Sequence, residues 1–387
     1  MKTILRAPVL SLSGYGIHSR QVFEWLENIP GNDLTVEVVP WGQTSWMING
    51  DMEDGLISRI TSRATPDKNK QYDYSFQVQL PDEWDPNLAR KNIGMSAFVE
   101  TDRCNPDWIR ACNAMDAVIV PSTFTKNIIK RTGPVIKPMT VIPEWYNQNI
   151  DLDESADDLG LKLECKFNFL LVGTLTGMHT NLDRKNIFNT IKWFCEQFEG
   201  DKTTGLIIKT GSGKGTTIDK QMTTDIIKTA IKEVRKGKYP RIELLHGNMT
   251  NKQVAKLYRH NKIKCMITAT RGEGYGLPLV EAAASGLPII ATGWSGHMEF
   301  LKKELIASVN YKLETIHPQK VDNRIFMSDA RWANVLESDF KAKMLKVRKD
   351  LNTYKKRSLK LKSHVRNNFC KKTVLTMYDN FFKKYFV

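Results

Sequence analysis

Short β-rich runs alternate with helical patterns along most of this chain, and the alternation limits the folds open to it. In the first 143 residues, runs rich in branched and aromatic side chains predict strands, with amphipathic stretches between several of them. A helix between two strands returns the chain to a parallel sheet, so the pattern predicts βαβ units. The predicted strands are 3–10, 34–39, 74–80, 93–99, 117–121 and 139–142, and the predicted helices include 17–27 and 123–131.

A second alternation follows a polar stretch. Residues 144–166 include the run Asp-Leu-Asp-Glu-Ser-Ala-Asp-Asp and show no strand pattern, which indicates a linker. We therefore predict an α/β fold with two Rossmann-like, doubly wound domains, 1–145 and 166–330, that face a cleft and are joined by a linker over 146–165. The predicted strands of the second domain are 167–173, 205–210, 241–246, 265–269 and 287–292, and its predicted helices are 184–198, 217–236, 251–260 and 277–285.

The positive charge of the chain gathers near its C-terminal end. The formal net charge is +15, and residues 341–387 hold fifteen lysines and arginines against two acidic residues. We predict basic helices over 331–387, the last of them packing back on the N-terminal domain. A segment of this kind favours contact with a polyanion, such as DNA, an anionic membrane surface or an acidic glycan. A solvated helix face is the alternative interpretation.

Targeting and metal signals are weak. No apolar run reaches the length that spans a bilayer, and the first ten residues are too short and interrupted for a signal peptide. The six cysteines show neither CxxC pairs nor a disulfide-framework spacing. We expect a reduced, cytoplasmic protein, with peripheral membrane contact left open. Asp151-Leu-Asp153 matches an Asp-x-Asp metal motif but lies in the linker, so we expect no metal and no cofactor.

The segment Arg271-Gly-Glu-Gly-Tyr-Gly-Leu-Pro-Leu-Val-Glu281 joins a predicted buried strand to a predicted helix. Pro278 suits the first turn of that helix, where free N–H groups and the positive end of the helix dipole attract an anion such as a phosphate. Gly274 and Gly276 would let the backbone approach the anion closely. A carboxylate beside a phosphate is repelled, so we expect Glu273 and Glu281 to accept hydrogen bonds from sugar hydroxyls instead.

Two cations complete this predicted anion site. Arg184 and Lys185 follow the first predicted strand of the second domain and open a predicted helix. Basic residues at a helix start oppose the dipole, which favours an anion between them. Arginine can bind a diphosphate through two hydrogen bonds, and lysine acts as a point charge.

At these residues the chain resembles the retaining glycosyltransferases of family four, which have the GT-B fold and an E-x7-E signature. The resemblance implies that Glu273 contacts hydroxyls of the transferred sugar, that Glu281 binds the ribose, and that Arg184 and Lys185 neutralise the diphosphate. It also implies phosphate contacts from the backbone. From its position after another strand of this domain, the loop 246–249 is expected near the nucleotide base. The residues expected to make those contacts are Gly274, Tyr275, Gly276 and Leu277 for the phosphate, and His246 and Asn248 for the base.

Two segments of the N-terminal domain extend the resemblance. Residues 12–20, Leu-Ser-Gly-Tyr-Gly-Ile-His-Ser-Arg, resemble the family's glycine loop, which implies that Gly14 and Gly16 face the diphosphate. His18 is either a hydrogen-bond donor in the site or an ordinary first-turn residue. The series that begins with Glu100-Thr-Asp102 is similar to one branch of the family, which places Glu100 at the cleft edge and Asp102 on the acceptor side, although a structural role for Glu100 remains open.

The resemblance implies transfer with retention, and no obvious enzymic nucleophile is present. We therefore expect front-face substitution, in which the departing diphosphate takes the acceptor proton. Two acceptors stay open: a bacterial glycan or glycolipid, and modified (hydroxymethylated) DNA bases, since segments such as 12–20 are similar to tailed-phage glycosyltransferases. A nucleotide-sugar-binding regulator without transferase activity is the alternative.

Three tryptophans and one glycine-rich loop remain unassigned. Trp41, Trp46 and Trp84 could stack on sugars or bases, or pack within the protein. The loop 210–217 is similar to a P-loop, but it lacks the first glycine and the Ser or Thr after Lys214. We therefore do not expect it to be an ATP site.

Overall fold

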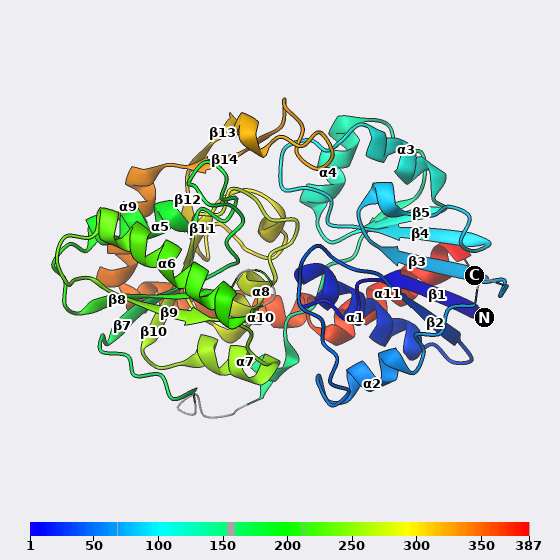
Figure 1. Cartoon of the computed structure of the whole chain (residues 1–387), viewed down its shortest axis with the longest axis horizontal. Coiled ribbons are helices and arrows are strands. Elements are labelled where there is room, and N and C mark those ends of the chain that lie inside the picture. The colour runs from blue at the N-terminus through cyan, green and yellow to red at the C-terminus, as the bar shows by residue number, and fades with distance from the viewer. Residues whose placement is uncertain (68, 153–158, 212, 214, 387) are drawn as a thin grey trace.

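The computed structural model describes residues 1–387 apart from 68, 153–158, 212, 214 and 387, and it has two α/β domains (Figure 1). Each domain is built on a six-stranded sheet in which every pair of neighbouring strands is parallel. The predicted fold class is confirmed: two Rossmann-like α/β domains with helices at the C-terminal end.

The first sheet has the order β2-β1-β3-β4-β5-β6. Its inward side chains, such as Phe76 and Ile93, are fully buried against α1, which contributes Phe23 and Trp25 to the same core. The strands are β1 (Lys2–Ala7), β2 (Asp33–Val38), β3 (Tyr74–Val78), β4 (Lys91–Met95), β5 (Ala117–Val120) and β6 (Met139–Val141). The helices are α1 (Gly14–Glu27), α2 (Leu56–Thr61), α3 (Asp107–Ala114) and α4 (Thr123–Thr132), with a 3-10 turn η1 (Pro81–Glu83).

The second sheet has the order β12-β11-β10-β7-β8-β9. Its strands are β7 (Phe167–Val172), β8 (Thr204–Thr210), β9 (Arg241–His246), β10 (Ile263–Thr268), β11 (Ile289–Thr292) and β12 (Ala307–Val309). The helices are α5 (Ile187–Gln197), α6 (Thr217–Val234), α7 (Asn251–Arg259) and α8 (Leu277–Ser285), with 3-10 turns η2 (Gln148–Asp151), η4 (Gly296–Glu299) and η5 (Pro318–Lys320). The strand order reverses between β7 and β10, and a crevice at such a switch point is where ligands bind in doubly wound sheets.

A two-stranded antiparallel sheet follows, made by β13 (Tyr311–Thr315) and β14 (Arg331–Val335). The expectation of helices from residue 331 onward is therefore wrong at its start. Arg331–Val335 is a strand because each of its residues pairs with one of β13, with Trp332 opposite Glu314. The partner strand lies sixteen residues upstream, so the pattern within these five residues does not reveal the pairing.

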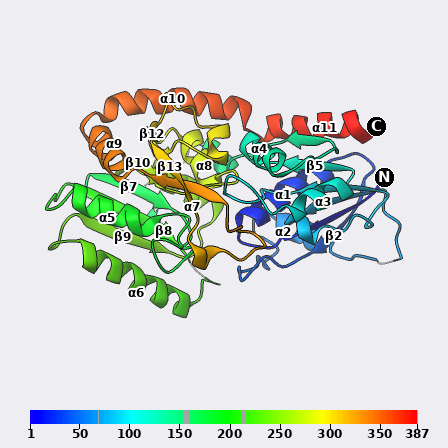
Figure 2. The same ribbon diagram turned by 90° about the horizontal axis from the view of Figure 1, so that it is seen from above.

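The C-terminal helices are α9 (Glu337–Lys349), α10 (Leu351–Asn368) and α11 (Lys371–Phe386). Helices α10 and α11 follow one another along one side of the molecule, α10 beside the second domain and α11 beside the first (Figure 2). Tyr378 of α11 stacks on Trp25 with ring centroids 4.8 Å apart, and Trp25 Nε1 donates to Asp379. The chain end therefore contributes to the core of the N-terminal domain. None of the described helices is long and apolar enough to cross a membrane.

Candidate functional site

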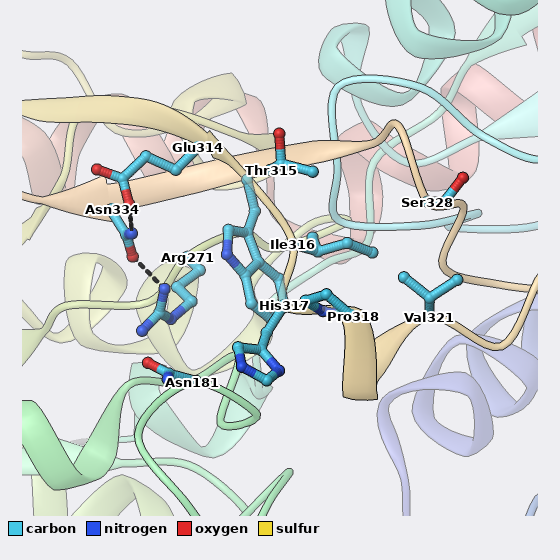
Figure 3. A pocket seen from close by; sticks show the side chains of 11 residues that line it. Asn181, Arg271, Glu314, Thr315, Ile316, His317, Pro318, Val321, Ser328 and Asn334 are labelled. Carbon is cyan, nitrogen blue, oxygen red and sulfur yellow. Dashed lines mark hydrogen bonds between the residues drawn. The ribbon is translucent and has the colours of Figure 1, made fainter.

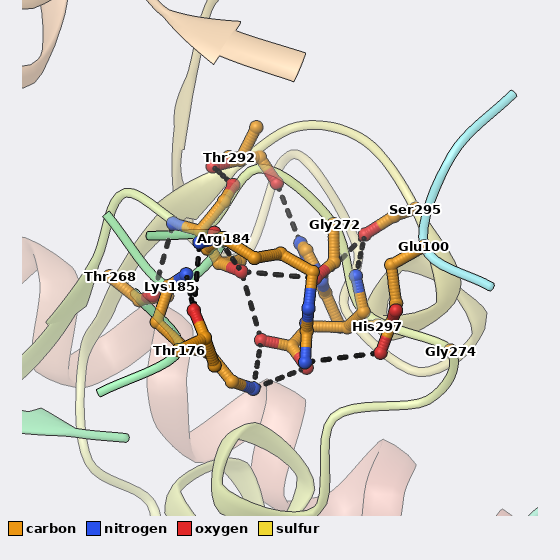
Figure 4. Close-up of polar contacts among 12 residues, drawn as sticks. Glu100, Thr176, Arg184, Lys185, Thr268, Gly272, Gly274, Thr292, Ser295 and His297 are labelled. Atoms are coloured by element: carbon orange, nitrogen blue, oxygen red, sulfur yellow. Dashed lines mark hydrogen bonds and ion pairs between the residues drawn. The ribbon is translucent and has the colours of Figure 1, made fainter. Parts of the chain in front are cut away.

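The switch in strand order brings two loops of the second domain together. The loop 173–186 follows β7 and leads into α5, and the segment 269–276 follows β10 and leads into α8. Because β7 and β10 are hydrogen-bonded neighbours, both loops leave the same edge of the sheet side by side. Arg184, Lys185 and Glu273 meet at this point (Figure 4).

Helix α8 presents its N-terminus to this site. Gly276 precedes the helix with φ 106°, a left-handed conformation that glycine adopts without strain, and Pro278 occupies the first turn. Among the described residues no side chain caps this end. Pro278 has no N–H, and the amides of Leu279 and Val280 donate to the Gly276 carbonyl at 2.9 and 3.1 Å. The backbone at Gly276 and Leu277 and the positive end of the helix dipole are therefore what this end offers an anion.

The carboxylate of Glu273 is held by two cations. Lys185 Nζ lies 2.7 and 2.6 Å from its two oxygens, and Arg184 Nη1 lies 3.5 Å from one of them. Thr270 Oγ1 donates a further hydrogen bond of 3.0 Å. Burial would raise the pKa of Glu273, which is 8 % exposed, but Lys185 and Arg184 outweigh it and lower the pKa to about 2. Glu273 is therefore an anion at every physiological pH.

Glu100 reaches the same cations from the other domain. Its Oε1 lies 3.1 Å from Arg184 Nη2, so Arg184 bridges Glu100 and Glu273 (Figure 4). Burial lowers the pKa of Arg184, but the two acids more than offset this and raise it. Two cations and two carboxylates thus balance one another across the domain boundary.

The glycines of the motif are packed against the N-terminal domain. A Cβ on Gly274 would lie 2.8 Å from the Cβ of Ala97, and one on Gly272 would collide with the backbone of Glu100. Ser122 Oγ also donates to the carbonyl of Gly274 at 2.8 Å. At Gly274 the missing side chain therefore makes room for the opposing domain, and contact of its backbone with an anion stays a prediction.

The loop 293–297, which the sequence analysis did not include in the site, contacts the backbone of Glu273. Ser295 Oγ accepts from Glu273 N at 2.9 Å, and Gly296 N donates to the Glu273 carbonyl at 2.8 Å. His297 is buried, and its Nε2 lies 2.7 Å from the Thr292 carbonyl. The run Thr-Gly-Trp-Ser-Gly-His (292–297), directly after a predicted strand, was the signal for a tight loop at the same sheet edge.

The remaining residues expected on the nucleotide side lie at two places. Glu281 projects from α8 and hydrogen-bonds Tyr258, and burial raises the pKa of Glu281 to about 8. His246 ends the edge strand β9, where Thr223 Oγ1 lies 3.2 Å from its Nε2. Asn248 is exposed two residues further on.

Tyr275, which was expected to contact the phosphate through its backbone, is buried. Its hydroxyl donates to the Glu144 carbonyl at 2.6 Å, which connects the motif to the segment between the domains.

The two glycines of the 12–20 loop have different surroundings. A Cβ on Gly14 would lie 4.0 Å from Leu277 Cδ1, so this glycine faces the first residue of α8 across the domain boundary. A Cβ on Gly16 would collide with the carbonyl oxygen of Ser11. Gly16 therefore allows close packing at the start of α1, and Gly14 is the one beside the motif.

His18 and Asp102 are both engaged by other elements. His18 is 2 % exposed, its Nε2 lies 3.2 Å from the hydroxyl of Tyr378 on α11, and burial lowers its pKa to about 4. Both oxygens of Asp102 accept from Arg331, one from the backbone N at 2.7 Å and one from Nε at 2.8 Å. Neither side chain is open to an acceptor in the arrangement described, because packing and ion pairing already occupy them.

The chain between β13 and β14 also reaches the N-terminal domain. Arg324 forms ion pairs of 2.6 and 2.7 Å with Asp82 and Glu83 of η1. Together with the pair of Asp102 and Arg331, these contacts join the two domains beside the site. No local pattern in the sequence predicted this connection.

A cavity of about 480 Å³ lies between the 173–186 loop and the β13–β14 pair (Figure 3). Arg271 on its wall donates to Asn334 and to the Thr180 carbonyl, and its guanidinium lies 5.1 Å from the ring centroid of Trp332. Its planar group is thus held by stacking and hydrogen bonds, which fixes the chain just before Glu273.

The remaining sequence motifs give no second site. Asp151 accepts from Tyr146 and pairs with Arg366, whereas Asp153 lies outside the described residues. Ser212 and Lys214 of the P-loop-like segment also lie outside them. In the described part of the chain, no group of three or more His, Cys, Asp or Glu residues could hold a metal ion.

Comparison with known proteins supports a sugar-transferring enzyme. Residues 236–310, which include the Glu273 motif, match the family model described as Glycosyl transferases group 1. No curated protein sequence matches the chain.

Solved structures resemble the whole chain in fold. Anabaena Alr3699/HepE in complex with UDP-glucose superposes with a TM-score of 0.66 at 11% identity, covering 99% of this chain and 100% of that one. A glycosyltransferase from Rickettsia africae gives 0.64 at 14% identity over 99% and 98%. Sucrose-phosphate synthase from Thermosynechococcus elongatus gives 0.63 at 11% identity over 100% and 99%. At these identities the likeness shows the fold, which is GT-B. Together with the match of residues 236–310 to the group 1 glycosyltransferase domain, it indicates that the chain is a glycosyltransferase.

Proposed function

We propose that the enzyme moves a sugar from a nucleotide-diphosphate sugar to an acceptor hydroxyl with retention of anomeric configuration. The observation that carries the proposal is the carboxylate of Glu273 beside Lys185 and Arg184, at the uncapped N-terminus of α8. Cations and helix N–H groups suit a diphosphate, and a carboxylate next to them suits sugar hydroxyls. The neighbour from Anabaena was solved with UDP-glucose, which supports a donor of this class.

In this proposal the donor lies along the crevice between β7 and β10. Arg184, Lys185 and the backbone of residues 274–277 bind the diphosphate, and Glu273 binds the sugar. Glu281 binds the ribose, with His246 and Asn248 near the base. Donor binding must break the contact of 2.6 Å between Lys185 and Glu273, so the diphosphate exchanges one ion pair for another.

The proposed reaction is a front-face substitution. The bond between the anomeric carbon and the diphosphate oxygen breaks, and the acceptor oxygen bonds to the same face of that carbon. The acceptor proton passes to the departing diphosphate, whose charge Arg184, Lys185 and the α8 N-terminus stabilise. Glu100 lies 3.1 Å from Arg184, where its negative charge can stabilise the oxocarbenium-like sugar or orient the acceptor.

Donor hydrolysis across a panel of nucleotide sugars tests this proposal. We expect release of the nucleoside diphosphate from at least one donor, without added divalent metal and in the presence of a chelator. With DNA and lipid acceptors then added in turn, NMR of the glycoside that forms should show the anomeric configuration of the donor. An inverted product, or a trapped glycosyl-enzyme adduct, contradicts front-face retention.

The regulator alternative predicts a different result from the same variant. If the chain binds a nucleotide sugar without transferring it, Glu273→Ala should leave its regulatory output intact. Under the proposal, the same substitution abolishes product formation. Because turnover assays and binding assays report separately, a protein that binds the donor and never releases product would favour the regulator.

The charge of the C-terminal helices supports a proposal for the class of acceptor. Lys355, Lys356 and Lys360 are exposed on α10, and in the described part of the chain none of them forms an ion pair. Such a face fits a polyanion close to the acceptor: either DNA with hydroxymethylated bases, as in a phage-type enzyme, or a bacterial glycan or glycolipid at an anionic membrane. A base in duplex DNA would have to be flipped out to react.

Charge removal on α10 separates these acceptors. The triple substitution Lys355→Gln, Lys356→Gln, Lys360→Gln should weaken binding to the true polyanion and flatten its salt dependence. The exposed lysines Lys220, Lys228 and Lys232 of α6, changed to Gln together, are the charge-matched control. Duplex DNA and anionic lipid vesicles serve as the two probes. If both triple variants bind both probes equally well, the lysines of α10 do not bind the polyanion, and this part of the proposal is wrong.

A further inference from the structure

The three tryptophans that the sequence left unassigned differ in their burial and in their neighbours. Trp84 is buried against Gly94, whose added Cβ would lie 2.7 Å from its ring. Trp41 stacks on Tyr15, with ring centroids 3.8 Å apart and an angle of 19° between the planes. Trp46 is 44 % exposed. Trp46 is thus the tryptophan of this group that offers a large apolar surface to a ligand.

Trp46 is exposed although its backbone is firmly held. It forms an isolated antiparallel bridge with Ser11, flanked by hydrogen bonds from Leu12 N to Ser45 O (2.9 Å) and from Met47 N to Leu10 O (2.7 Å). Met47 is buried in the N-terminal core, whereas Ile48 is 81 % exposed. Side chains alternate along an extended segment, so Trp46 and Ile48 share its outer side.

This segment lies directly beside the proposed donor site. Ser11 and Leu12, its bridge partners, lead straight into Gly14, which faces Leu277 at the start of α8. The Tyr15 hydroxyl, beneath Trp41, lies 3.0 Å from the amide of Ala97, the residue packed against Gly274. The bridge therefore holds the backbone of Trp46 beside the residues that lead into the glycine loop.

The charge around Trp46 disfavours a nucleic-acid backbone. Asp51 and Asp54 follow within eight residues, are exposed, and form no ion pair with any described residue. Glu53 between them hydrogen-bonds Asn251 of α7. A phosphate chain that crosses the exposed part of residues 46–54 would meet these carboxylates, and like charges repel. A neutral ring meets no such penalty.

We infer that Trp46, together with Ile48, is a stacking surface for a neutral sugar ring of the acceptor. The inference rests on the proposed sugar transfer and deepens it by naming the acceptor group. One face of a pyranose carries C–H groups that pack on an indole ring, while its hydroxyls stay in water at the exposed edge. Trp46 thereby orients an acceptor ring toward the glycine loop, and the polyanion-binding face of α10 remains a separate surface.

Saturation-transfer NMR tests this directly, without donor and without turnover. The probes are methyl pyranosides of glucose, galactose, mannose and N-acetylglucosamine, with deoxynucleosides and a short DNA duplex as the competing class. We expect ring-proton signals from at least one pyranoside. Its affinity should fall by about tenfold or more in Trp46→Ala and in part recover in Trp46→Phe, since one lost ring contact is worth a factor of this order.

The matched control is Ile136→Ala, which removes an 82 % exposed apolar side chain elsewhere on the N-terminal domain. It should bind the pyranosides like the unchanged protein. Three outcomes overturn the inference: no pyranoside signal, a signal that is the same in Trp46→Ala, or a Trp46-dependent signal from nucleosides or DNA instead.

Failure of the inference is distinguishable from failure of the proposed function. Donor hydrolysis reports the transferase chemistry, and pyranoside binding reports Trp46. If hydrolysis is absent but Trp46-dependent sugar binding is present, the transfer proposal fails and the sugar surface stands. If both are present, Trp46→Ala should lower the ratio of transfer to hydrolysis and raise the acceptor KM.

Discussion

Lys185 Nζ lies 2.6 Å from Oε2 of Glu273, so a cation proposed for the donor diphosphate is neutralised by a carboxylate proposed for the donor sugar. Arg184 stands in the same relation to Glu100 of the opposite domain, at 3.1 Å. A buried cation without a counter-ion is costly, and these pairs remove that cost before the donor arrives. The donor must then compete with Glu273 for Lys185.

Glu273→Gln separates binding from turnover. The substitution frees Lys185 for phosphate and removes a carboxylate from the sugar. We expect kcat to fall by about 100-fold or more, as when one electrostatic group of an active site is removed, while the nucleoside diphosphate of the active donor binds at least as tightly as before. Initial rates and isothermal titration measure the two effects. Glu304→Gln, at an exposed position of the same domain, should change neither. Parallel loss of nucleoside-diphosphate affinity and turnover would contradict the competition between donor and Glu273 for Lys185.

Gly14→Ala and Gly16→Ala should differ sharply in stability. The new methyl group at Gly16 collides with the Ser11 carbonyl, a backbone atom that cannot turn away, so we expect a loss of about 1–3 kcal/mol in unfolding free energy. At Gly14 the methyl group makes ordinary contact with Leu277 at 4.0 Å, and stability should be unchanged. Urea unfolding followed by circular dichroism compares them. Equal destabilisation would mean that the start of α1 is arranged differently.

The Asp102–Arg331 pair should couple the two domains energetically. Its oxygen–nitrogen distance is 2.8 Å, but half of the Arg331 side chain is exposed, so solvent screens the attraction. We expect a coupling of about 1 kcal/mol in a double-mutant cycle with Asp102→Asn and Arg331→Gln. Chemical denaturation of the two single variants and the double variant measures it. Additive effects would show that the backbone hydrogen bond from Arg331 N carries the contact instead.

Glu144 should make stability fall as pH rises. It is 5 % exposed, its Oε2 has no hydrogen-bond partner among the described residues, and burial raises its pKa from the ordinary 4.5 to about 8. Between these values the unfolded chain binds fewer protons than the folded one, so the free energy of unfolding decreases as pH increases.

Glu144→Gln removes this dependence. We expect the Tm of the variant, relative to the unchanged protein, to rise steadily from pH 5 to pH 8. Scanning calorimetry at several pH values gives the difference. Glu233→Gln, at an exposed site of α6, is the control and should show a constant offset. A difference that is flat or falls with pH would refute the raised pKa.

Local sequence patterns predicted the strands of both sheets except β12 (Ala307–Val309). The predicted strand 241–246 is β9 and the predicted helix 277–285 is α8, with the same ends in the structure. Other ends differ by a few residues, as where β4 stops at Met95 and the prediction ran to 99. Periodicity, Pro278 and the surrounding glycines are local signals, so they specify an element without knowledge of its neighbours.

The tertiary structure decided which of these elements meet. The pairing of β7 with β10 brings Lys185 to Glu273, 88 residues away in the sequence. Packing of α11 on the N-terminal domain encloses His18, and pairing of β14 with β13 carries Arg331 to Asp102. The motif around Glu273 could therefore be recognised from the sequence alone. Its ion pairs with Lys185 and Arg184, and the packing of the N-terminal domain against its glycines, depend on long-range contacts, which a local sequence pattern does not contain.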